Sequence, residues 1–326
     1  MQRRNFLHAA VGTFAAGAFA GIAPAFAAKA TNDAGTLSDV ASFTAALKYA
    51  KLRQGRIAYI DRGKGDVVLF MHGFPVNSYQ WRGMIERLQG ECRCVAPDFL
   101  ALGRTQTAPG QSVTPAAQVE MITTLLDHLK IDKVHIVAND SGIAVAQLYV
   151  IAYPDRVRTL LLTTGDTEVN SPPPGMVDVI AAAHAGKFGS EMMLQQVNDK
   201  EGARNDPGQF GGLCFTYPHQ LTDETIEYYL RPLTVSPERQ KLADAYALGL
   251  DPNPLAGVEA KLKKLQHPVR VVWGTGDTIF RQEDADYLSG VFPKSRGVRR
   301  VEGAKLFFPE EFPDLLAEEQ RALRKA

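Results

Sequence analysis

The carboxylate of Asp140, at the junction between a predicted strand and a predicted helix, is the side chain best placed for covalent chemistry. Residues 134–138 read Val-His-Ile-Val-Ala, which is typical of a buried strand, and the small residues from Gly142 onward indicate a helix with almost no loop before it. A strand that turns this sharply into a helix holds its central residue strained. The side chain of that residue then lies at the top of the turn, where it acts as a nucleophile.

The size of the neighbouring residues indicates which residue is central. The turn accepts only small residues two positions before and two positions after the nucleophile, because helix and strand pack closely there. With Asp140 at the centre, these positions hold Ala138 and Gly142, which fit. With Ser141 at the centre, one of them holds Ile143, which does not fit. We therefore predict an aspartate nucleophile; the alternative is an ordinary strand–helix junction with Asp140 as the helix N-cap.

Segments with strand and helix patterns surround this turn and would position it. Residues 49–52 and 55–60 alternate in polarity as a hairpin does, and residues 115–129 carry the apolar spacing of a helix. Further strands are predicted at residues 67–71, 92–98, 158–163, 269–273 and 298–301. Strands and helices in alternation predict an α/β protein with a doubly wound, mostly parallel sheet.

The overall composition argues against several classes of partner and cofactor. The chain has 326 residues, with 36 basic and 36 acidic side chains, so nothing indicates binding to nucleic acid or to a lipid surface. Its three cysteines, Cys92, Cys94 and Cys214, have neither the spacing of a metal site nor that of a disulfide framework. We expect no metal and no cofactor.

The first residues have the pattern of an export signal. Arg3 and Arg4 open the chain, an Ala/Gly/Phe-rich run follows, and Ala25-Phe26-Ala27 offers a cleavage site. Residues 1–27 are therefore predicted to be a twin-arginine signal peptide and the mature protein to be periplasmic. The alternative is an N-terminal membrane anchor, but the apolar run is short and Gly-rich for a spanning helix.

Four stretches together resemble a known family. They are His72–Arg82, Arg93–Asp98, the turn at Asp140, and Trp273–Asp277. They are similar to the α/β-hydrolase branch that uses an aspartate nucleophile, of which haloalkane dehalogenases and epoxide hydrolases are members. The resemblance runs from about residue 50 to the end of the chain and is weakest in the middle.

The resemblance implies a fold with an inserted cap. Residues 43–166 would form the first part of the α/β-hydrolase core and residues 256–326 the second part. Residues 167–255, which begin near a proline cluster at residues 172–174, would form a helical cap over the nucleophile. In this fold the cap shapes the substrate cavity.

The resemblance also implies a mechanism in two steps. Asp140 would attack an electrophilic carbon and form an alkyl ester. Water activated by a histidine would then hydrolyse the ester, with the backbone N–H groups of Phe74 and Ser141 as the oxyanion hole. Asp277 is at the position of the acid that orients the histidine, and Asp166 is at a second position used by some dehalogenases. The alternatives are a solvated loop or capping role for Asp277 and a purely structural role for Asp166.

The histidine itself is absent from its usual position. The pattern places it at Leu306, or at Lys305 if the loop is shifted by one residue, and neither side chain serves as a base near neutral pH. Among the other histidines, His72 is expected to support the oxyanion turn. His219, in the predicted cap, is a candidate replacement base, although a lone histidine is more often structural.

The residues around the nucleophile also bear on the substrate. Dehalogenases of this branch commonly hold the halide with a tryptophan after the nucleophile and an asparagine in the oxyanion turn, where this chain has Ser141 and Phe74. Epoxide hydrolases use phenylalanine at the latter position, with tyrosines of the cap. The expected substrate-binding residues are Trp81, Tyr217 and Tyr228, with Tyr229 and Tyr246 as further cap candidates, although any of the tyrosines could simply pack.

Three functional hypotheses follow. The first is a periplasmic hydrolase that forms an alkyl ester on Asp140 with a small apolar epoxide or haloalkane and has an altered second step. The second is a non-catalytic or impaired relative that binds a small apolar ligand. The third, ester hydrolysis through Ser141, is disfavoured by the spacing of small residues around the turn.

Overall fold

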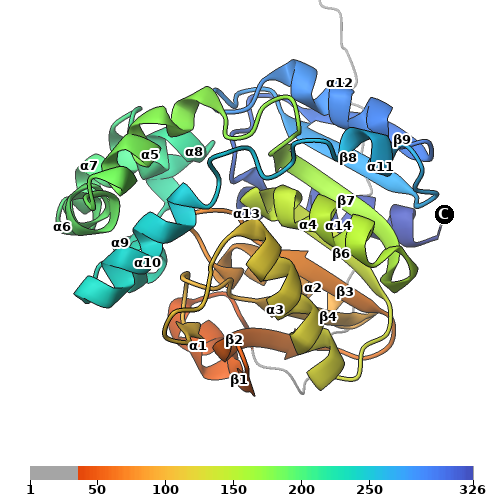
Figure 1. Cartoon of the computed structure of the whole chain (residues 1–326), viewed down its shortest axis with the longest axis horizontal. Coiled ribbons are helices and arrows are strands. Elements are labelled where there is room, and N and C mark those ends of the chain that lie inside the picture. Colours follow the sequence, from red (N-terminus) through yellow and green to blue (C-terminus); the bar gives the residue numbers. More distant parts are fainter. Residues whose placement is uncertain (1–35, 326) are drawn as a thin grey trace, which may run out of the picture. The chain divides into compact units, whose positions relative to one another are not determined.

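A nine-stranded, mostly parallel sheet organises residues 36–325, which are the part of the chain that this computed structural model describes (Figure 1). The predicted signal, residues 1–27, lies outside the described residues. The strands are β1 (Lys48–Leu52), β2 (Gly55–Arg62), β3 (Val67–Met71), β4 (Arg93–Pro97), β5 (Gln106–Thr107), β6 (Val134–Asp140), β7 (Val157–Gly165), β8 (Val269–Gly274) and β9 (Ser295–Val301).

The directions of the paired strands agree with the prediction from the sequence. Eight of them run in the order β1-β2-β4-β3-β6-β7-β8-β9, and β5 pairs with β2. β2 is antiparallel to β1, β4 and β5, and the remaining pairs are parallel. Every residue of β3 and β6 is buried, because parallel strands in the middle of a sheet are covered on both faces. The predicted doubly wound, mostly parallel sheet is confirmed.

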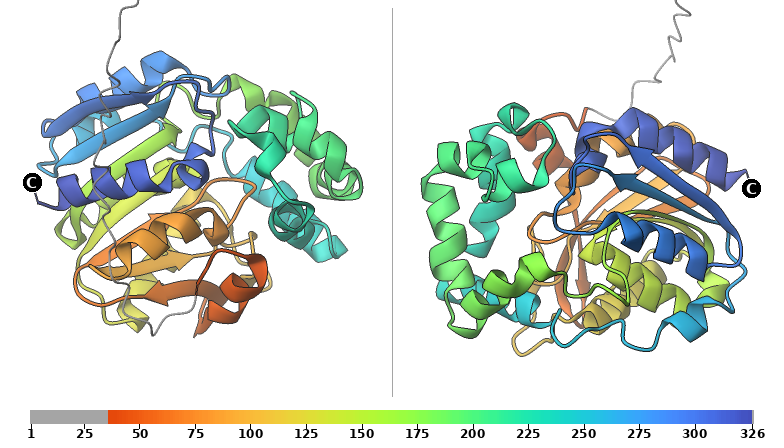
Figure 2. Two further views of the ribbon diagram at one scale, coloured as in Figure 1. Left: turned by 180° about the vertical axis from the view of Figure 1, so that it is seen from behind. Right: turned by 90° about the horizontal axis from the view of Figure 1, so that it is seen from above.

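Helices cover the two faces of the sheet. α3 (Pro115–His128) and α4 (Ser141–Ala152) pack together on the face seen in Figure 1, and α4 contacts β6 and β7. α2 (Arg82–Leu88) and α14 (Pro313–Arg324) pack together on the opposite face, seen from behind in Figure 2. α12 (Gln282–Val291) contacts β8 and β9. The turn between β6 and α4 is thereby held between two rigid elements.

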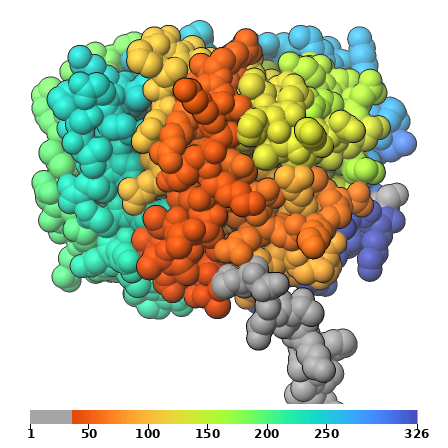
Figure 3. All heavy atoms as spheres, turned by 90° about the horizontal axis from the view of Figure 1, so that it is seen from below, coloured from red at the N-terminus to blue at the C-terminus, as the bar shows by residue number. Residues whose placement is uncertain are grey.

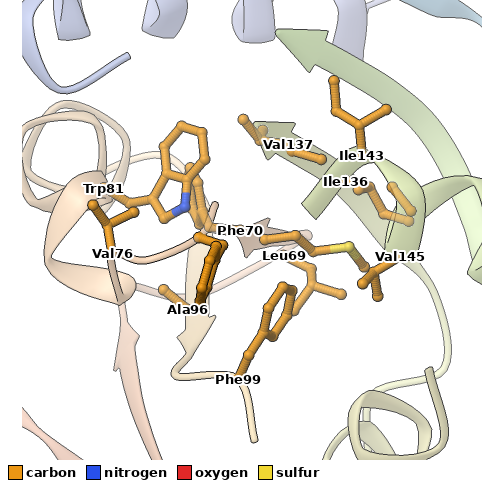
Figure 4. Close-up of a cluster of buried hydrophobic side chains, with 14 of the residues drawn as sticks. Leu69, Phe70, Val76, Trp81, Ala96, Phe99, Ile136, Val137, Ile143 and Val145 are labelled. Carbon is orange, nitrogen blue, oxygen red and sulfur yellow. The ribbon is translucent and has the colours of Figure 1, made fainter. Parts of the chain in front are cut away.

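The hydrophobic core lies around the two central strands. Figure 4 shows Phe70 of β3 and Val137 of β6 among the buried side chains, with Trp81 beside them. The indole of Trp81 packs against the Phe70 ring at a centroid distance of 5.5 Å. Burial of such large aromatic side chains anchors the segment that follows β3, and that segment carries the predicted oxyanion turn.

Between β7 and β8 the regular elements are all helical. They are α5 (Val177–His184), a π-helix (Phe188–Met193), α6 (Leu194–Asn198), α7 (Lys200–Asn205), α8 (Phe210–Cys214), α9 (Asp223–Leu230), α10 (Pro237–Leu248) and α11 (Glu259–Leu262), with short 3-10 turns between them. Figures 1 and 2 show α5 to α10 grouped to one side of the sheet, whereas α11 lies with the core helices. The residues from α5 to α10 are called the helical insertion below.

The helical insertion is hydrogen-bonded to a buried ion pair of the core. Arg82 Nη1 lies 2.7 Å from Glu310 Oε1, and both side chains are largely shielded from solvent. The hydroxyl of Tyr229, on α9, donates to Glu310 Oε2 at 2.6 Å. Because Glu310 belongs to α13 (Phe308–Glu311), a single carboxylate joins the insertion, α2 and the loop after β9.

The insertion contacts the core at a second place. The guanidinium of Arg239, on α10, donates to the carbonyl oxygens of Thr105 and Gly103 at 2.8 and 3.0 Å. α1 (Val40–Ala46) contacts α9, where the ring of Phe43 meets that of Tyr228 at 6.2 Å. Figure 3 shows the orange N-terminal segment between the cyan part of the insertion and the yellow part of the core.

None of the helices within residues 36–325 combines the length and the apolar character that crossing a membrane would need.

Candidate active site

Asp140 occupies the turn between β6 and α4 in a strained backbone conformation. Its φ and ψ are 55° and −132°, and α4 begins at the next residue. Such angles are rare for a residue other than glycine and persist only where the surroundings enforce them. A Cβ on Gly142 would lie 2.5 Å from the carbonyl oxygen of Met71, and one on Gly73 would lie 2.5 Å from Asp140 Cβ. These contacts are the physical reason for the small residues on which the sequence argument relied.

Two backbone N–H groups hold the Asp140 carboxylate. Asp140 Oδ1 accepts hydrogen bonds from Phe74 N at 2.8 Å and from Ser141 N at 2.5 Å. These are the two donors that the resemblance implied for an oxyanion hole. No residue of the described range donates to Oδ2, and Asp140 lines a cavity. Burial raises the pKa of Asp140, and the two N–H groups oppose this shift by favouring the carboxylate.

The cavity above Asp140 has a volume of about 280 Å³. Core residues form one side, among them Phe74, Asp166 and Leu306. Side chains of the helical insertion form the other side, and most of them are apolar: Val179, Phe188, Met192, Met193, Phe210, Leu213 and Cys214. A lining of this kind suits a small, largely apolar molecule with a few polar contacts near the nucleophile.

Asp166 is a second carboxylate in the same cavity. It follows β7 directly, is 2% exposed, and its Oδ1 accepts a hydrogen bond from Ser171 Oγ at 2.7 Å. Burial, followed by the negative charge of Asp140, raises the pKa of Asp166 to about 7. The structure thus places Asp166, which the sequence argument ranked second, beside the nucleophile.

Asp277 follows β8 and does not line the cavity. Its Oδ1 accepts hydrogen bonds from Ile279 N at 2.6 Å and Phe280 N at 3.4 Å. Its Oδ2 is buried and has no partner among the described residues. Burial raises the pKa of Asp277 to about 7. Buried carboxylate oxygens usually accept a hydrogen bond, and the family resemblance places a histidine donor near this oxygen.

Leu306 lies where that donor is expected. Its side chain is buried and lines the cavity, and its loop is joined to the loop of Asp277 by the hydrogen bond from Gly276 N to Ala304 O at 2.9 Å. The neighbouring Lys305 directs its ammonium group to the carbonyl oxygen of Gly212 in the helical insertion. No histidine is among the residues that line the cavity within the described range.

His72 supports the oxyanion turn from below. Its Nε2 accepts a hydrogen bond from Phe99 N at 2.9 Å, so Nδ1 carries the proton and donates to Gly73 O at 2.8 Å. Burial lowers the pKa of His72 to about 4, which keeps the imidazole neutral. With both ring nitrogens engaged, His72 has the geometry of the supporting residue that the sequence predicted.

Four other predicted site residues lie away from the cavity. Trp81 is fully buried in the core, and Tyr228 packs against Tyr79 at a centroid distance of 5.1 Å. Tyr217 is 41% exposed, and His219 lies beside it at the surface in a short 3-10 turn. The structure therefore gives these residues packing or surface positions in place of the expected contact with substrate or nucleophile. Trp81 packs against Phe70 within the core, and the insertion turns the other three side chains toward the core or toward solvent.

Tyr246, on α10, is the tyrosine that reaches the nucleophile turn. Its ring stacks on Phe74 at a centroid distance of 4.9 Å and an angle of 12°, and its hydroxyl lies 3.1 Å from Ser141 Oγ. It therefore contacts both residues whose N–H groups hold Asp140. In the sequence it was one of several cap tyrosines, and no local pattern distinguished it.

The described residues contain no group of three or more histidine, cysteine, aspartate or glutamate side chains arranged to hold a metal ion. The three cysteines are free and buried, and Cys92 Sγ and Cys94 Sγ lie 3.9 Å apart.

Comparison with known proteins assigns this fold to a family. A family model described as alpha/beta hydrolase fold matches residues 66–312, and the chain belongs to that family. The chain is 26% identical to haloalkane dehalogenase 2 of Mycobacterium tuberculosis over 282 residues, which cover 81% of this chain and 90% of the relative. It is 39% identical to epoxide hydrolase 2 of Siraitia grosvenorii over 101 residues, which cover 30% of this chain and 32% of the relative.

Solved structures agree with this assignment at the level of the fold. A crystal structure of an alpha/beta hydrolase fold protein from Burkholderia ambifaria superposes with a TM-score of 0.71 at 21% identity, covering 83% of this chain and 96% of the other. The predicted α/β-hydrolase fold is confirmed, and the relatives support the expectation that the protein is a hydrolase.

The environment of Asp277 gives a testable dependence of stability on pH. Its pKa is about 7 in the folded protein, against an ordinary value of 3.8. A carboxyl group whose pKa is raised in the folded protein contributes its full stabilisation below the pKa that it has in the unfolded chain. This contribution is lost as the pH rises through the pKa of the folded protein. The free energy of unfolding of Asp277→Asn, taken relative to that of the wild type, should therefore be larger at pH 8 than at pH 4.5. These two pH values lie on either side of the pKa of about 7.

Urea unfolding of both proteins at the two pH values measures this difference. Asp132→Asn, at an exposed position, is the matched control and should show no such change. An equal effect of Asp277→Asn at both pH values would contradict the raised pKa.

Proposed function

We propose that the protein is a hydrolase in which Asp140 attacks an electrophilic carbon of a small epoxide or haloalkane and forms an alkyl ester. The observation that carries this proposal is the placement of the Asp140 carboxylate. The N–H groups of Phe74 and Ser141 donate to Oδ1, and no described residue donates to Oδ2. The carboxylate lines an apolar cavity. A largely desolvated carboxylate with one oxygen fixed and the other unengaged is suited to in-line attack on carbon.

The residues around Asp140 favour an epoxide over a haloalkane. A departing halide needs N–H donors where its charge develops. The chain has two tryptophans, Trp81 and Trp273, and both are buried outside the cavity. The oxygen of an opened epoxide stays attached to the product and needs only a proton. The relatives named haloalkane dehalogenase and epoxide hydrolase support this general class of reaction.

The proposed reaction lacks the usual base for its second step. Leu306 occupies the expected position of the histidine, and Asp277 Oδ2 has no partner among residues 36–325. Loss of a general base typically slows a step by about a hundred- to ten-thousand-fold. We therefore expect the alkyl ester on Asp140 to live longer than in an enzyme that has this histidine.

Intact-mass measurement tests the alkylation. Incubation with styrene oxide or epoxyhexane should add the mass of the whole epoxide, whereas bromobutane should add only its butyl group, because bromide leaves. Asp140→Asn keeps the size of the side chain but removes the nucleophile, so it should form no adduct. Asp178→Asn, at an exposed position on the cavity wall, is the matched control and should react like the wild type. Absence of both adduct and product from the wild type would reject the proposal.

A second candidate function is binding without chemistry. Leu306 and the apolar insertion residues make the cavity suitable for a small apolar ligand even if no bond forms. Under this hypothesis, the same compounds raise the melting temperature equally in the wild type and in Asp140→Asn, and no adduct appears in either protein.

Restoring an imidazole tests the proposed explanation for the slow step. Leu306→His would place a ring in the cavity wall on a loop adjacent to that of Asp277, whose Oδ2 has no partner among the described residues. We expect hydrolysis of a preformed ester to accelerate by about a hundred- to ten-thousand-fold, the usual effect of a positioned general base. Decay of the adduct mass after removal of excess epoxide measures this rate. Leu306→Gln, which has no basic group, is the control.

We also propose that residues 1–27 direct export by the twin-arginine route and that the mature protein is periplasmic. Arg3, Arg4 and the cleavage pattern at residues 25–27 support this. A Lys-Lys replacement of the two arginines should retain an uncleaved precursor in the cytoplasmic fraction of a bacterial host. Export that is unaffected by this replacement would contradict the proposal.

A further inference from the structure

We propose that Asp166 performs the proton transfers of the epoxide reaction, acting as the acid in the first step and as the base in the second. This inference rests on the proposed function, because it requires an alkyl ester on Asp140. It assigns to a carboxylate the base role that Leu306 leaves unfilled and adds the protonation of the epoxide oxygen.

The topology of the sheet places the two carboxylates together. β6 and β7 are adjacent and parallel, and Asp140 at the end of β6 pairs with Gly165 at the end of β7. Asp166 is the next residue, and its N lies 3.5 Å from the carbonyl oxygen of Asp140. A Cβ on Gly165 would lie 2.6 Å from Asp140 Cα, so only glycine permits this approach. Both carboxylates line the same cavity.

The hydrogen bonds of Asp166 leave one oxygen available. Oδ1 accepts from Ser171 Oγ at 2.7 Å, and the backbone carbonyl accepts from Gln147 Nε2 at 2.9 Å. No residue of the described range donates to Oδ2. The carboxyl group is therefore fixed in orientation through one oxygen, while the other can exchange a proton with a molecule in the cavity. The cavity volume of about 280 Å³ has room for a small substrate and a water molecule.

The charges that face Asp166 favour its protonated form before reaction. Asp140 on β6 and Asp284 on α12 both act on it as negative charges. Further titratable groups of this site are Tyr246 on α10, and Asp178 and Cys214 on the cavity wall. Alkylation converts Asp140 into a neutral ester and removes one of these negative charges. The ionised form of Asp166 then becomes easier to reach, so the same group is an acid before alkylation and a better base after it.

The proton balance closes over the two steps. In the first step an oxygen of Asp140 bonds to an epoxide carbon, the carbon–oxygen bond of the ring breaks, and the epoxide oxygen takes the proton of Asp166. In the second step the Asp166 carboxylate takes one proton from water, and the resulting hydroxide adds to the ester carbonyl carbon. The oxyanion forms at the oxygen held by Phe74 N and Ser141 N. Collapse breaks the ester bond, and the departing alkoxide takes the remaining proton of that water, which leaves a diol and an ionised Asp140.

Other titratable groups near the site are less suited to this role. Asp277 does not line the cavity, and Lys305 donates to Gly212 O. Burial raises the pKa of Tyr246, and its hydroxyl is engaged with Ser141 Oγ, so it cannot take a proton from water near neutral pH. Cys214 lines the cavity, but burial raises the pKa of its thiol well above the usual value.

Asp166→Asn separates the two roles by comparing two alkylating agents. Bromobutane needs no proton donor, so the variant should be alkylated at about the wild-type rate. With styrene oxide, alkylation should slow by about a hundred-fold or more, which is the usual effect of removing a general acid. The ester formed from either compound should persist, whereas in the wild type it should decay to product. Asp132→Asn, at an exposed position outside the cavity, is the carboxylate control and should leave all these rates unchanged.

A pH series gives a readout that a merely structural role would not move. Alkylation of the wild type by styrene oxide should fall as the pH rises through about 7, as Asp166 loses its proton, and this decline should be absent from Asp166→Asn. Should Asp166→Asn fail to fold, Ser171→Ala keeps the carboxyl group but removes the hydroxyl that orients it. Hydrolysis of its ester should then slow by about tenfold, with bromobutane alkylation retained.

Each result supports or overturns the inference. Wild-type rates of ester decay and of epoxide opening in Asp166→Asn, or in Ser171→Ala if only that variant folds, would overturn it. An ester that accumulates in the wild type without any decay would overturn the base role and leave the alkylation by Asp140 intact. Absence of both adduct and product from the wild type would instead reject the proposed function itself, and this inference with it.

Discussion

The two hydrogen bonds from Phe74 N and Ser141 N to Asp140 Oδ1 are the constraint on which the site depends. They form only because β6 ends in a residue with positive φ and α4 begins immediately after it. The turn after β3 must also approach within contact distance, which the absence of a side chain on Gly73 permits. A strained residue persists where its surroundings enforce it, and here three segments do so.

The charge balance of the site differs from that of an ordinary acid–base pair. Asp140 and Asp166 are buried, Asp277 is half-buried, and Leu306 lines the cavity at the position where the family resemblance places a histidine. Burial raises the pKa of each carboxyl group, because the charged forms lose solvation. One of the three is adjacent to the nucleophile and another has an oxygen without a partner among the described residues. Two of these acids, Asp140 and Asp166, therefore line an apolar cavity, and Asp277 lies in the loop that is hydrogen-bonded to the loop of Leu306.

The helical insertion completes the cavity and contacts the core at two separate places. The Arg82–Glu310 pair with Tyr229 holds α9, and Arg239 holds α10 against the loop that follows β4. Removing one partner of a buried ion pair leaves an uncompensated charge, so such pairs hold elements in a defined arrangement. Tyr246 extends this coupling to the nucleophile turn, because it stacks on Phe74 and contacts Ser141.

The family resemblance implied the two N–H donors at Asp140, and the sheet and the turn at Asp140 could be predicted from the residues alone. These depend on local patterns: apolar runs for β3 and β6, and small residues at Ala138 and Gly142. Which distant side chains face the cavity depends on the tertiary structure. In the structure Trp81 and Tyr228 are packed in the interior, and His219 is at the surface. Asp166 lies beside Asp140 in the cavity. The physical reason is that periodicity and turn chemistry act between near neighbours in the chain, whereas the direction of a side chain in the insertion depends on the packing of helices far apart in sequence.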